Sequence, residues 1–153
     1  MQYSSDQCAS EVLETVPLVM RSVRSELRKH RGGDLSVPQF RTLFYVSRHE
    51  GTSLSAVADH VGLTLPSMSR IVDMLVARKL ATRTTHHGDR RRMTLTLTNQ
   101  GRATLRSARK VTESYLRDLL EALSSDKRAT LVEAMRILRP IFSQSQSRQE
   151  AGG

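Results

Sequence analysis

The fold is decided by residues 54–79, LSAVADHVGLTLPSMSRIVDMLVARK. Within this stretch, Leu54 to Val61 is predicted as a short helix, residues 62–64 as a tight turn, and Pro66 to Lys79 as a second helix. Apolar residues recur at spacings of three and four in both helices, the pattern of a helix with one buried face. Two helices joined by a short turn that contains Gly are typical of a helix-turn-helix, whose second helix enters the major groove of DNA.

A strand, a basic tip and a second strand are predicted next. Met93, Leu95 and Leu97 alternate with threonines, which is the period of a half-buried strand, and residues 80–85 are its expected antiparallel partner. The tip between them is HHGDRRR, residues 86–92. Gly88 permits the turn, and three successive arginines are more than a hairpin requires. Arginines at such a tip favour insertion into a narrow minor groove.

Within the tip, Asp89 and Arg91 are two residues apart, so their side chains can point the same way. We expect the carboxylate of Asp89 to hold the guanidinium of Arg91 in an extended position. The alternative is an exposed ion pair that contributes at most about 1 kcal/mol.

Positive charge is concentrated in the same part of the chain. The chain has 24 Lys and Arg against 15 Asp and Glu, a net charge of +9. Residues 64–102 contain eight of these basic residues and only two acidic ones, so they carry about two-thirds of the excess. A solvated helix normally mixes the signs, so arginines that serve only solubility are the weaker explanation. A single-sign cluster beside a helix-turn-helix indicates a phosphate partner, here double-stranded DNA.

The second helix of the motif begins with residues 64–70, TLPSMSR. Pro66 removes an N–H that the first turn does not use, and the remaining free amides can bind a phosphate. Ser67 and Ser69 are short enough to let the helix approach base edges, although exposed serines are also common on solvated helices. Arg70 can reach a guanine edge or a phosphate. The residues predicted to contact DNA are Ser53, Thr64, Pro66, Ser67, Ser69, Arg70, His87, Asp89, Arg90, Arg91 and Arg92.

Long amphipathic segments flank this central region. A first helix is predicted over residues 8–30, where Pro17 either kinks the helix or marks its start. A second helix runs from its cap at Ser36 to about His49. Thr98 caps a helix that ends at about Leu123. A last helix covers about 126–143 and contains Pro140, which bends or ends it, and the polar residues after it are typical of a frayed tail.

The predicted class is mainly α with a small β component (α+β), a winged helix-turn-helix whose N- and C-terminal helices form a dimerisation region. An apolar content of 38% gives a monomer a modest core, which favours burial of the amphipathic segments against a second copy. The predicted division is 1–35 for an N-terminal dimerisation helix, 36–100 for the DNA-binding domain, 101–143 for C-terminal dimerisation helices, and 144–153 for a flexible tail.

Composition and motifs disfavour several other classes. No apolar run approaches the roughly 20 residues that span a bilayer, and the first residues lack the features of a signal peptide. One Cys fits a reducing compartment, so we expect a cytoplasmic protein without a membrane partner. There is no nucleophile elbow, phosphate loop or paired-carboxylate pattern, so an enzyme is not expected. The five His residues lack zinc spacing, and neither a metal nor another cofactor is expected.

The chain resembles the MarR family of transcriptional regulators. The segments that carry the resemblance are LSVPQF at 35–40, LSAVADHVGL at 54–63, MSRIVDML at 68–75, DRR at 89–91, and Leu97-Thr98 with Gly101. It extends over roughly residues 10–143, with departures at 78–81 and at the tip residues 86–88.

This resemblance implies a homodimer of winged helix-turn-helix subunits with interleaved terminal helices. It also implies repression at pseudo-palindromic promoter DNA, relieved by a small aromatic acid or an oxidant. Arg91 matches the family position that enters the minor groove, and Asp89 matches its orienting partner.

Two weaker signals concern regulation. Cys8 lies near the start of the first helix, where some redox-sensing relatives keep a reactive thiol, but a lone Cys without a basic neighbour is usually incidental. Arg21, Arg24 and Arg28 line one flank of that helix and are candidates for an anionic effector, but a solvated flank is the favoured explanation.

The leading hypothesis is a dimeric, sequence-specific transcriptional regulator, a repressor released by a small aromatic or anionic ligand or an oxidant. A sequence-blind architectural DNA-binding protein is the first alternative. A protein-binding winged helix or an unrecognised enzyme is the second, and it predicts no DNA binding.

Overall fold

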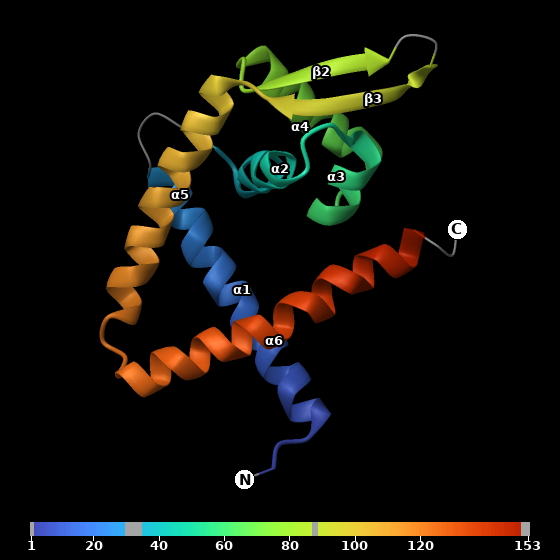
Figure 1. Cartoon of the computed structure of the whole chain (residues 1–153). Helices are drawn as coiled ribbons and strands as arrows, with labels where there is room; N and C mark the ends of the chain where they lie inside the picture. The colour runs from blue at the N-terminus through green and yellow to red at the C-terminus, as the bar shows by residue number, and fades with distance from the viewer. Residues whose placement is uncertain (1, 30–34, 87–88, 151–153) are drawn as a thin grey trace.

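A computed structural model describes residues 2–29, 35–86 and 89–150, with side chains described for all of these except 86, 89–92 and 144–150. The elements are α1 (Ser5–Lys29), α2 (Val37–Arg48), β1 (Thr52–Ser53), α3 (Leu54–Val61), α4 (Leu65–Ala77), β2 (Ala81–His86), β3 (Asp89–Leu97), α5 (Asn99–Leu120) and α6 (Ser125–Glu150). In Figure 1, α2, α3, α4 and the sheet gather at one end, and the long helices α1, α5 and α6 extend away from it. This arrangement confirms the predicted winged helix-turn-helix with long flanking helices.

The core lies between α2, α3, α4 and the sheet, and it is closed by the end of α1 and the first half of α5. The predicted inner faces of both helices of the motif are confirmed: Val57, Ala58 and Val61 are buried from α3, and Met68, Val72 and Leu75 from α4. Burial of one such apolar side chain stabilises the fold by about 1.5–3 kcal/mol.

The helices of the DNA-binding end begin at side-chain caps. The Ser36 hydroxyl accepts a hydrogen bond from the Gln39 amide at 3.2 Å, and the Gln39 side chain accepts one from the Ser36 amide at 3.0 Å. This reciprocal capping box confirms the predicted start of α2. Thr64 and Thr98 cap α4 and α5 in the simpler way, each accepting from the backbone amide three residues on.

Several predicted boundaries were wrong. The first helix begins at Ser5 rather than residue 8, with Pro17 in its interior, α4 ends at Ala77, and α5 ends at Leu120. Helix α6 continues past Pro140 to Glu150, where a frayed tail was expected after 143. The tail was inferred from polarity, but Gln, Arg and Glu are good helix formers, so a polar segment can extend an exposed helix.

The sheet has three antiparallel strands in the order β1-β3-β2. Thr52 pairs with Leu95 in β3, and Ala81 of β2 pairs with Leu97. The two-residue strand β1 was not predicted, because two residues are too few to show a strand period. It is held in part by the Gly51 amide, which donates to the Leu95 carbonyl oxygen at 2.9 Å.

The start of α5 is locked to the corner between α4 and β2. The Thr98 hydroxyl donates to the Lys79 carbonyl oxygen at 2.6 Å and accepts from the Gly101 amide at 2.9 Å. The Thr98 amide donates to the Leu80 carbonyl oxygen at 3.2 Å. Gly101 packs so closely on Leu80 that an added Cβ would lie 1.9 Å from that same oxygen. The Leu-Thr-x-x-Gly pattern at 97–101 therefore fixes the base of the β2–β3 hairpin to the helix that follows it.

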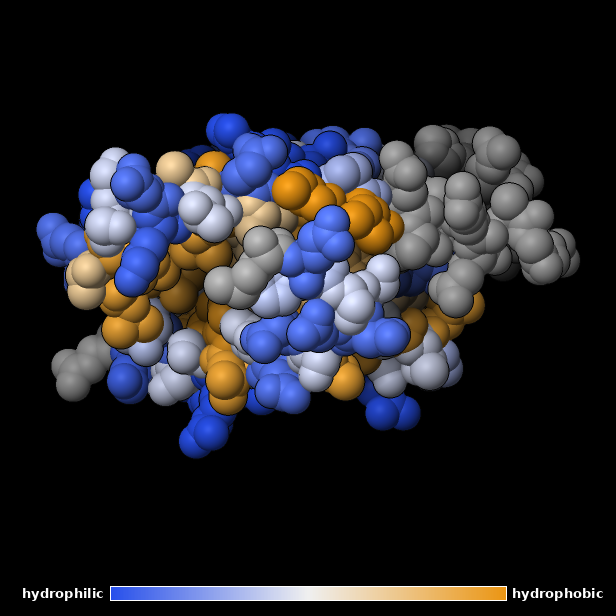
Figure 2. All heavy atoms as spheres, turned by 90° about the horizontal axis from the view of Figure 1, so that it is seen from below, coloured by the Kyte–Doolittle hydropathy of each residue, from blue (hydrophilic) through white to orange (hydrophobic). Residues whose placement is uncertain are grey.

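Helix α6 contrasts with the packed end of the molecule, because it makes only sparse contacts with the rest of the described chain. Figure 2, which views the molecule from the α1 and α6 end, shows apolar side chains gathered among polar ones on this face. Large apolar side chains at least 46% exposed on these two helices are Leu13, Val16, Leu18, Val19, Val132, Met135, Ile137, Ile141 and Phe142. In the part of the chain that the structure describes, no helix has the length and apolar character needed to cross a membrane.

Candidate nucleic-acid interface

The turn between α3 and α4 is fixed at both ends. Gly62 follows α3 with φ 79°, a left-handed conformation that glycine adopts without strain. The Arg41 guanidinium of α2 donates to the carbonyl oxygens of His60 at 3.0 Å and Val61 at 3.2 Å. These carbonyls lie at the negative end of α3, where a cation is favourable. The sequence does not single out Arg41, because a side chain that binds backbone 19 and 20 residues away leaves no local pattern.

Helix α4 presents an exposed face opposite its buried one. Ser67 and Ser69 lie at the edges of this face and are half-buried. At 3.6 residues per turn, Arg70 lies near the centre of the exposed face, diametrically opposite the core. Of the residues of α4 predicted to contact DNA, Pro66 and Arg70 are exposed, whereas Ser67 and Ser69 are partly covered. The exposed residues of this face are Pro66, Arg70, Asp73, Met74 and Ala77.

The first turn of α4 is largely satisfied by its own side chains. The Thr64 hydroxyl accepts from the Ser67 amide at 3.3 Å and donates to the Ser67 hydroxyl at 3.1 Å. Pro66 has no N–H to offer. Among the described contacts, the Leu65 amide is therefore the one amide of the first three helical residues that remains available to bind a phosphate. The sequence had suggested several such amides.

Ser53, another predicted DNA contact, caps α3. Its hydroxyl accepts from the Ala56 amide at 3.2 Å, and its backbone pairs with Thr94 in the sheet. The side chain is exposed, but its position follows from these structural roles.

Among the described side chains of residues 64–102, Arg83 and Arg102 form ion pairs with carboxylates. Arg83 on β2 forms an ion pair with Asp73 on the exposed face of α4, and so ties the sheet to this helix. Arg102 on α5 pairs with Glu50 at 2.5 Å. The positive charge available on this surface is thus smaller than the number of basic residues in the sequence indicates. Arg70 forms no ion pair with any described side chain.

The wing tip is described by its backbone alone. Strands β2 and β3 extend to a pairing of His86 with Asp89, and an irregularity in register falls between Thr85 and His86. Asp89, Arg90, Arg91 and Arg92 open β3, while His87 lies outside the described residues. Their predicted DNA contacts, and the orienting role of Asp89, stay predictions.

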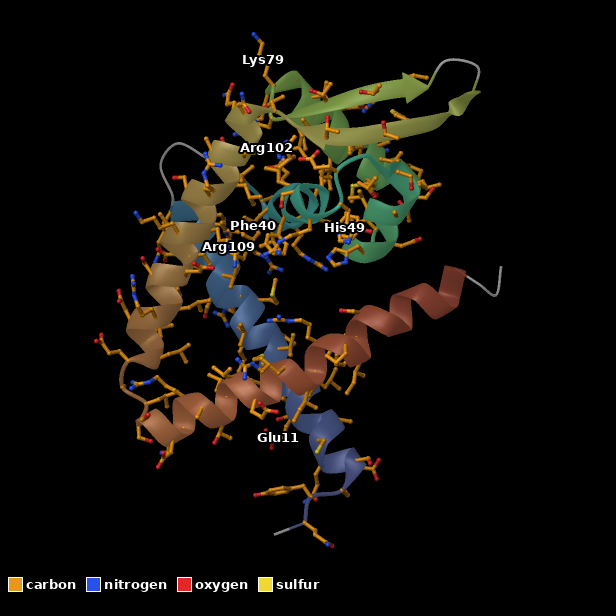
Figure 3. All side chains as sticks on the ribbon, in the orientation of Figure 1. Glu11, Phe40, His49, Lys79, Arg102 and Arg109 are labelled. Atoms are coloured by element: carbon orange, nitrogen blue, oxygen red, sulfur yellow. The ribbon has the colours of Figure 1, made fainter. Side chains whose placement is uncertain are left out.

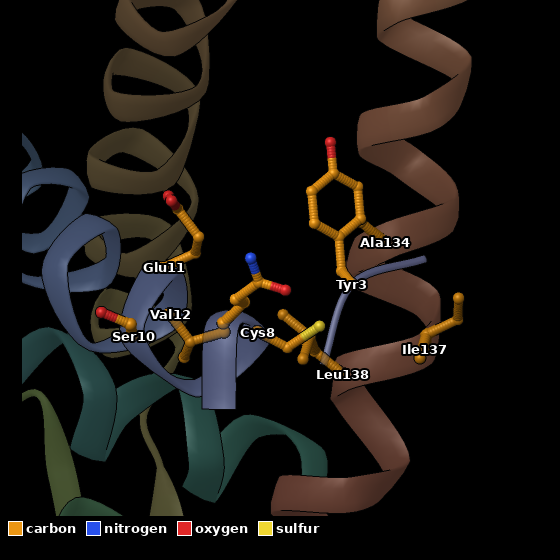
Figure 4. Close-up of a pocket in the computed structure, with 9 residues that line it drawn as sticks. Tyr3, Cys8, Ser10, Glu11, Val12, Ala134, Ile137 and Leu138 are labelled. Carbon is orange, nitrogen blue, oxygen red and sulfur yellow. The ribbon is translucent and has the colours of Figure 1, made fainter. Parts of the chain in front are cut away.

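Cys8 lies far from this surface. Its exposed thiol lines a cavity of about 660 Å³ between the start of α1 and α6, which is also lined by Tyr3, Ile137 and Leu138 (Figure 4). Among the described residues, no three His, Cys, Asp or Glu side chains come together as a metal site.

A second cavity, of about 230 Å³, lies between α2 and α5. The guanidinium carbons of Arg48 and Arg109 lie 5.4 Å and 5.2 Å from the centre of the Phe44 ring, within the range of a cation–π contact. Arg102 and Arg109 are on the side of α5 that faces α2 (Figure 3). Arg21, Arg24 and Arg28, the cations proposed from the sequence for an effector, do not line this cavity.

Known proteins are similar to this chain in the same region. A model described as the MarR family matches residues 33–92, the segment that contains both helices of the motif and most of the wing. The chain is 26% identical over 105 residues to the uncharacterized HTH-type transcriptional regulator YfiV of Bacillus subtilis, which corresponds to 69% of this chain and 66% of that protein.

Solved structures match the fold over nearly the whole chain. RV1404 from Mycobacterium tuberculosis is 25% identical with a TM-score of 0.68, covering 100% of this chain and 97% of that one. FabT from Streptococcus pneumoniae, solved in complex with DNA, is 18% identical with a TM-score of 0.70, covering 92% and 99%. Residues 33–92, with the motif and most of the wing, thus match the MarR family, and the chain as a whole shares its fold with solved winged helix-turn-helix regulators.

Proposed function

We propose that two copies of this chain bind a pseudo-palindromic promoter site in the cytoplasm and repress transcription until a small ligand or an oxidant acts. The observation that carries this proposal is the exposed face of α4, centred on Arg70, beside a hairpin that ends in Arg90, Arg91 and Arg92. A helix and a basic hairpin at one end of a subunit suit the major groove and the adjacent minor groove. The FabT structure with DNA supports this assignment by analogy of fold.

The dimer is proposed from the apolar surface of α1 and α6. A helix with sparse contacts to its own chain and five large exposed apolar residues is unfavourable in water, because each apolar side chain left exposed forgoes its transfer free energy. A second copy would bury this surface. The two recognition helices would then meet half-sites about one helical turn of DNA apart.

The cavity between α2 and α5 is our proposed effector site. Phe44 offers an aromatic face, and the arginines of the lining, Arg48, Arg102, Arg106 and Arg109, offer positive charge. Two of them pair with carboxylates, Arg102 with Glu50 and Arg109 with Glu113, so the carboxylate of a ligand would compete with these exposed ion pairs. This combination suits a small aromatic anion, since the ring can stack and the carboxylate can pair with a guanidinium. Because α2 packs on α3 and α4 and α5 continues from β3, an occupied cavity would shift the DNA-binding elements relative to the long helices.

Benzoate is a suitable probe of this site. We expect millimolar benzoate to release the protein from its DNA fragment, and the Arg109→Ala variant to need at least several-fold more benzoate. Fluorescence anisotropy of a labelled duplex gives the measurement, with Lys110→Ala, the neighbouring exposed cation, as the matched control. Equal benzoate sensitivity of the Arg109→Ala variant and the wild type would exclude this cavity as the site.

The regulator proposal itself is tested by sequencing the genomic fragments that the purified protein retains. We expect a small set of fragments that share an inverted repeat, and retention that survives an excess of bulk genomic DNA. A sequence-blind architectural protein would lose every fragment to that competitor. A protein that retains no duplex even in dilute buffer would refute any DNA-binding role.

A further inference from the structure

Among the described residues of the DNA-binding end, the large apolar side chains that are exposed lie on one helix, α4. Within the described residues, every large apolar side chain that is substantially exposed lies on α1, α5 or α6, except Tyr3, which precedes α1, and two residues of α4. The two on α4 are Leu65, 50% exposed, and Met74, 47% exposed. The proposed second copy would cover the terminal helices, whereas α4 lies at the other end of the molecule. A different occupant would have to cover the apolar part of α4.

Met74 belongs to the stripe that faces directly outward. With 100° of rotation per residue, Arg70, Met74 and Ala77 follow one another along the face opposite Met68 and Leu75. All three outward residues are exposed. Leu65 is rotated about 140° from Arg70 by the same geometry, so its exposure comes from its position at the end of the helix. The stripe therefore has a cationic end at Arg70 and an apolar end at Met74 and Ala77.

Among the described side chains of α4, no unpaired carboxylate lies beside the apolar end. The neighbouring carboxylate, Asp73, is held in an ion pair by Arg83. A free carboxylate here would repel phosphates and would be able to accept a hydrogen bond from the amino group of cytosine. Because Arg83 engages it, this end of the stripe offers chiefly methyl and thioether groups.

We propose that Met74, with Ala77 beside it, contacts the 5-methyl group of thymine in the major groove and so selects thymine in each half-site. This inference rests on the proposed DNA-binding function. Thymine is the one base that presents a methyl group in the major groove, and apolar side chains recognise it by contact. Met suits such a contact because its unbranched, polarisable side chain adapts to the shape of a neighbouring group.

Substitution of deoxyuridine for thymidine provides a direct test, since it removes only the 5-methyl group. In a duplex taken from the retained fragments, each thymidine of the half-site is replaced in turn, with both half-sites changed symmetrically. Burial of one methyl corresponds to about a four-fold effect on affinity per half-site, so a symmetric change in a dimer site gives on the order of ten-fold. We expect one or two thymidines to show this loss with the wild type, and Met74→Ala to bind both duplexes equally.

Leu65→Ala is the matched control, because Leu65 has nearly the same exposure on the same helix but lies off the stripe. It should keep the full preference for thymidine. The proposal is overturned if no thymidine shows a methyl effect, if the half-site contains no thymine, or if Met74→Ala keeps the preference. In each of these cases DNA binding itself persists, whereas failure of the proposed function would appear as loss of all binding.

Discussion

Replacement of Gly101 by Ala is expected to lower the free energy of unfolding by about 3 kcal/mol, at the upper end of the usual cost of overpacking. The added Cβ would lie 1.9 Å from the Leu80 carbonyl oxygen, which is backbone and already accepts a hydrogen bond from the Thr98 amide. Either α5 or the corner before β2 must move. For a chain of this size the loss corresponds to a fall in Tm of about 6–12 °C, measured by circular dichroism at one protein concentration.

The sign of this effect makes the experiment decisive. In an unconstrained helix, Gly→Ala stabilises by about 1 kcal/mol, so destabilisation can come only from the close approach to Leu80. Gln100→Ala is the control, because Gln100 is exposed in the same turn of α5. Its Tm should change by no more than a degree or two. A Gly101→Ala variant as stable as the wild type would mean that the corner between α4 and β2 does not rest on Gly101.

Local patterns in the sequence were sufficient to predict the elements around the site. The apolar spacing within 54–79 gave both helices of the motif, and the alternation of Met93, Leu95 and Leu97 gave the long strand of the wing. Each of these signals is contained in about ten residues, and the periods of a helix and a strand differ clearly. The cap at the start of α2 was equally predictable, since its two residues, Ser36 and Gln39, are only three positions apart in the sequence.

Contacts between distant residues were not predictable in this way. The link from Arg41 to the end of α3 and the pair between Asp73 and Arg83 join separate elements, and no periodicity marks them. The pair between Asp73 and Arg83 changes the expected charge of the DNA-binding surface. Asp73 and Arg83 were both assigned to the charge balance of the surface, yet together they leave a less charged, more apolar recognition face than composition implied.

DNA affinity is expected to fall about 10³–10⁵-fold between 50 and 200 mM salt, which is the largest effect that we predict for the proposed complex. A dimer that contacts on the order of 6–10 phosphates gives a slope of log affinity against log salt of about −5 to −9. Arg90, Arg91 and Arg92 from two subunits would supply six of these contacts, whereas Arg83 and Arg102 are already paired with carboxylates. Anisotropy titrations at four or five salt concentrations give the slope.

Arg91→Ala should reduce the magnitude of that slope by about 1.8, because each subunit loses one phosphate contact. The loss of affinity should be similar for the selected site and for unrelated DNA. By contrast, substitution of Ser67 or Arg70 should change the ratio between these two DNAs, because both side chains lie on the helix assigned to the major groove. Lys110→Ala removes the same formal charge from the exposed middle of α5 and should leave the slope nearly unchanged. Equal, sequence-independent losses from the Arg91, Ser67 and Arg70 variants would contradict this division between wing and recognition helix.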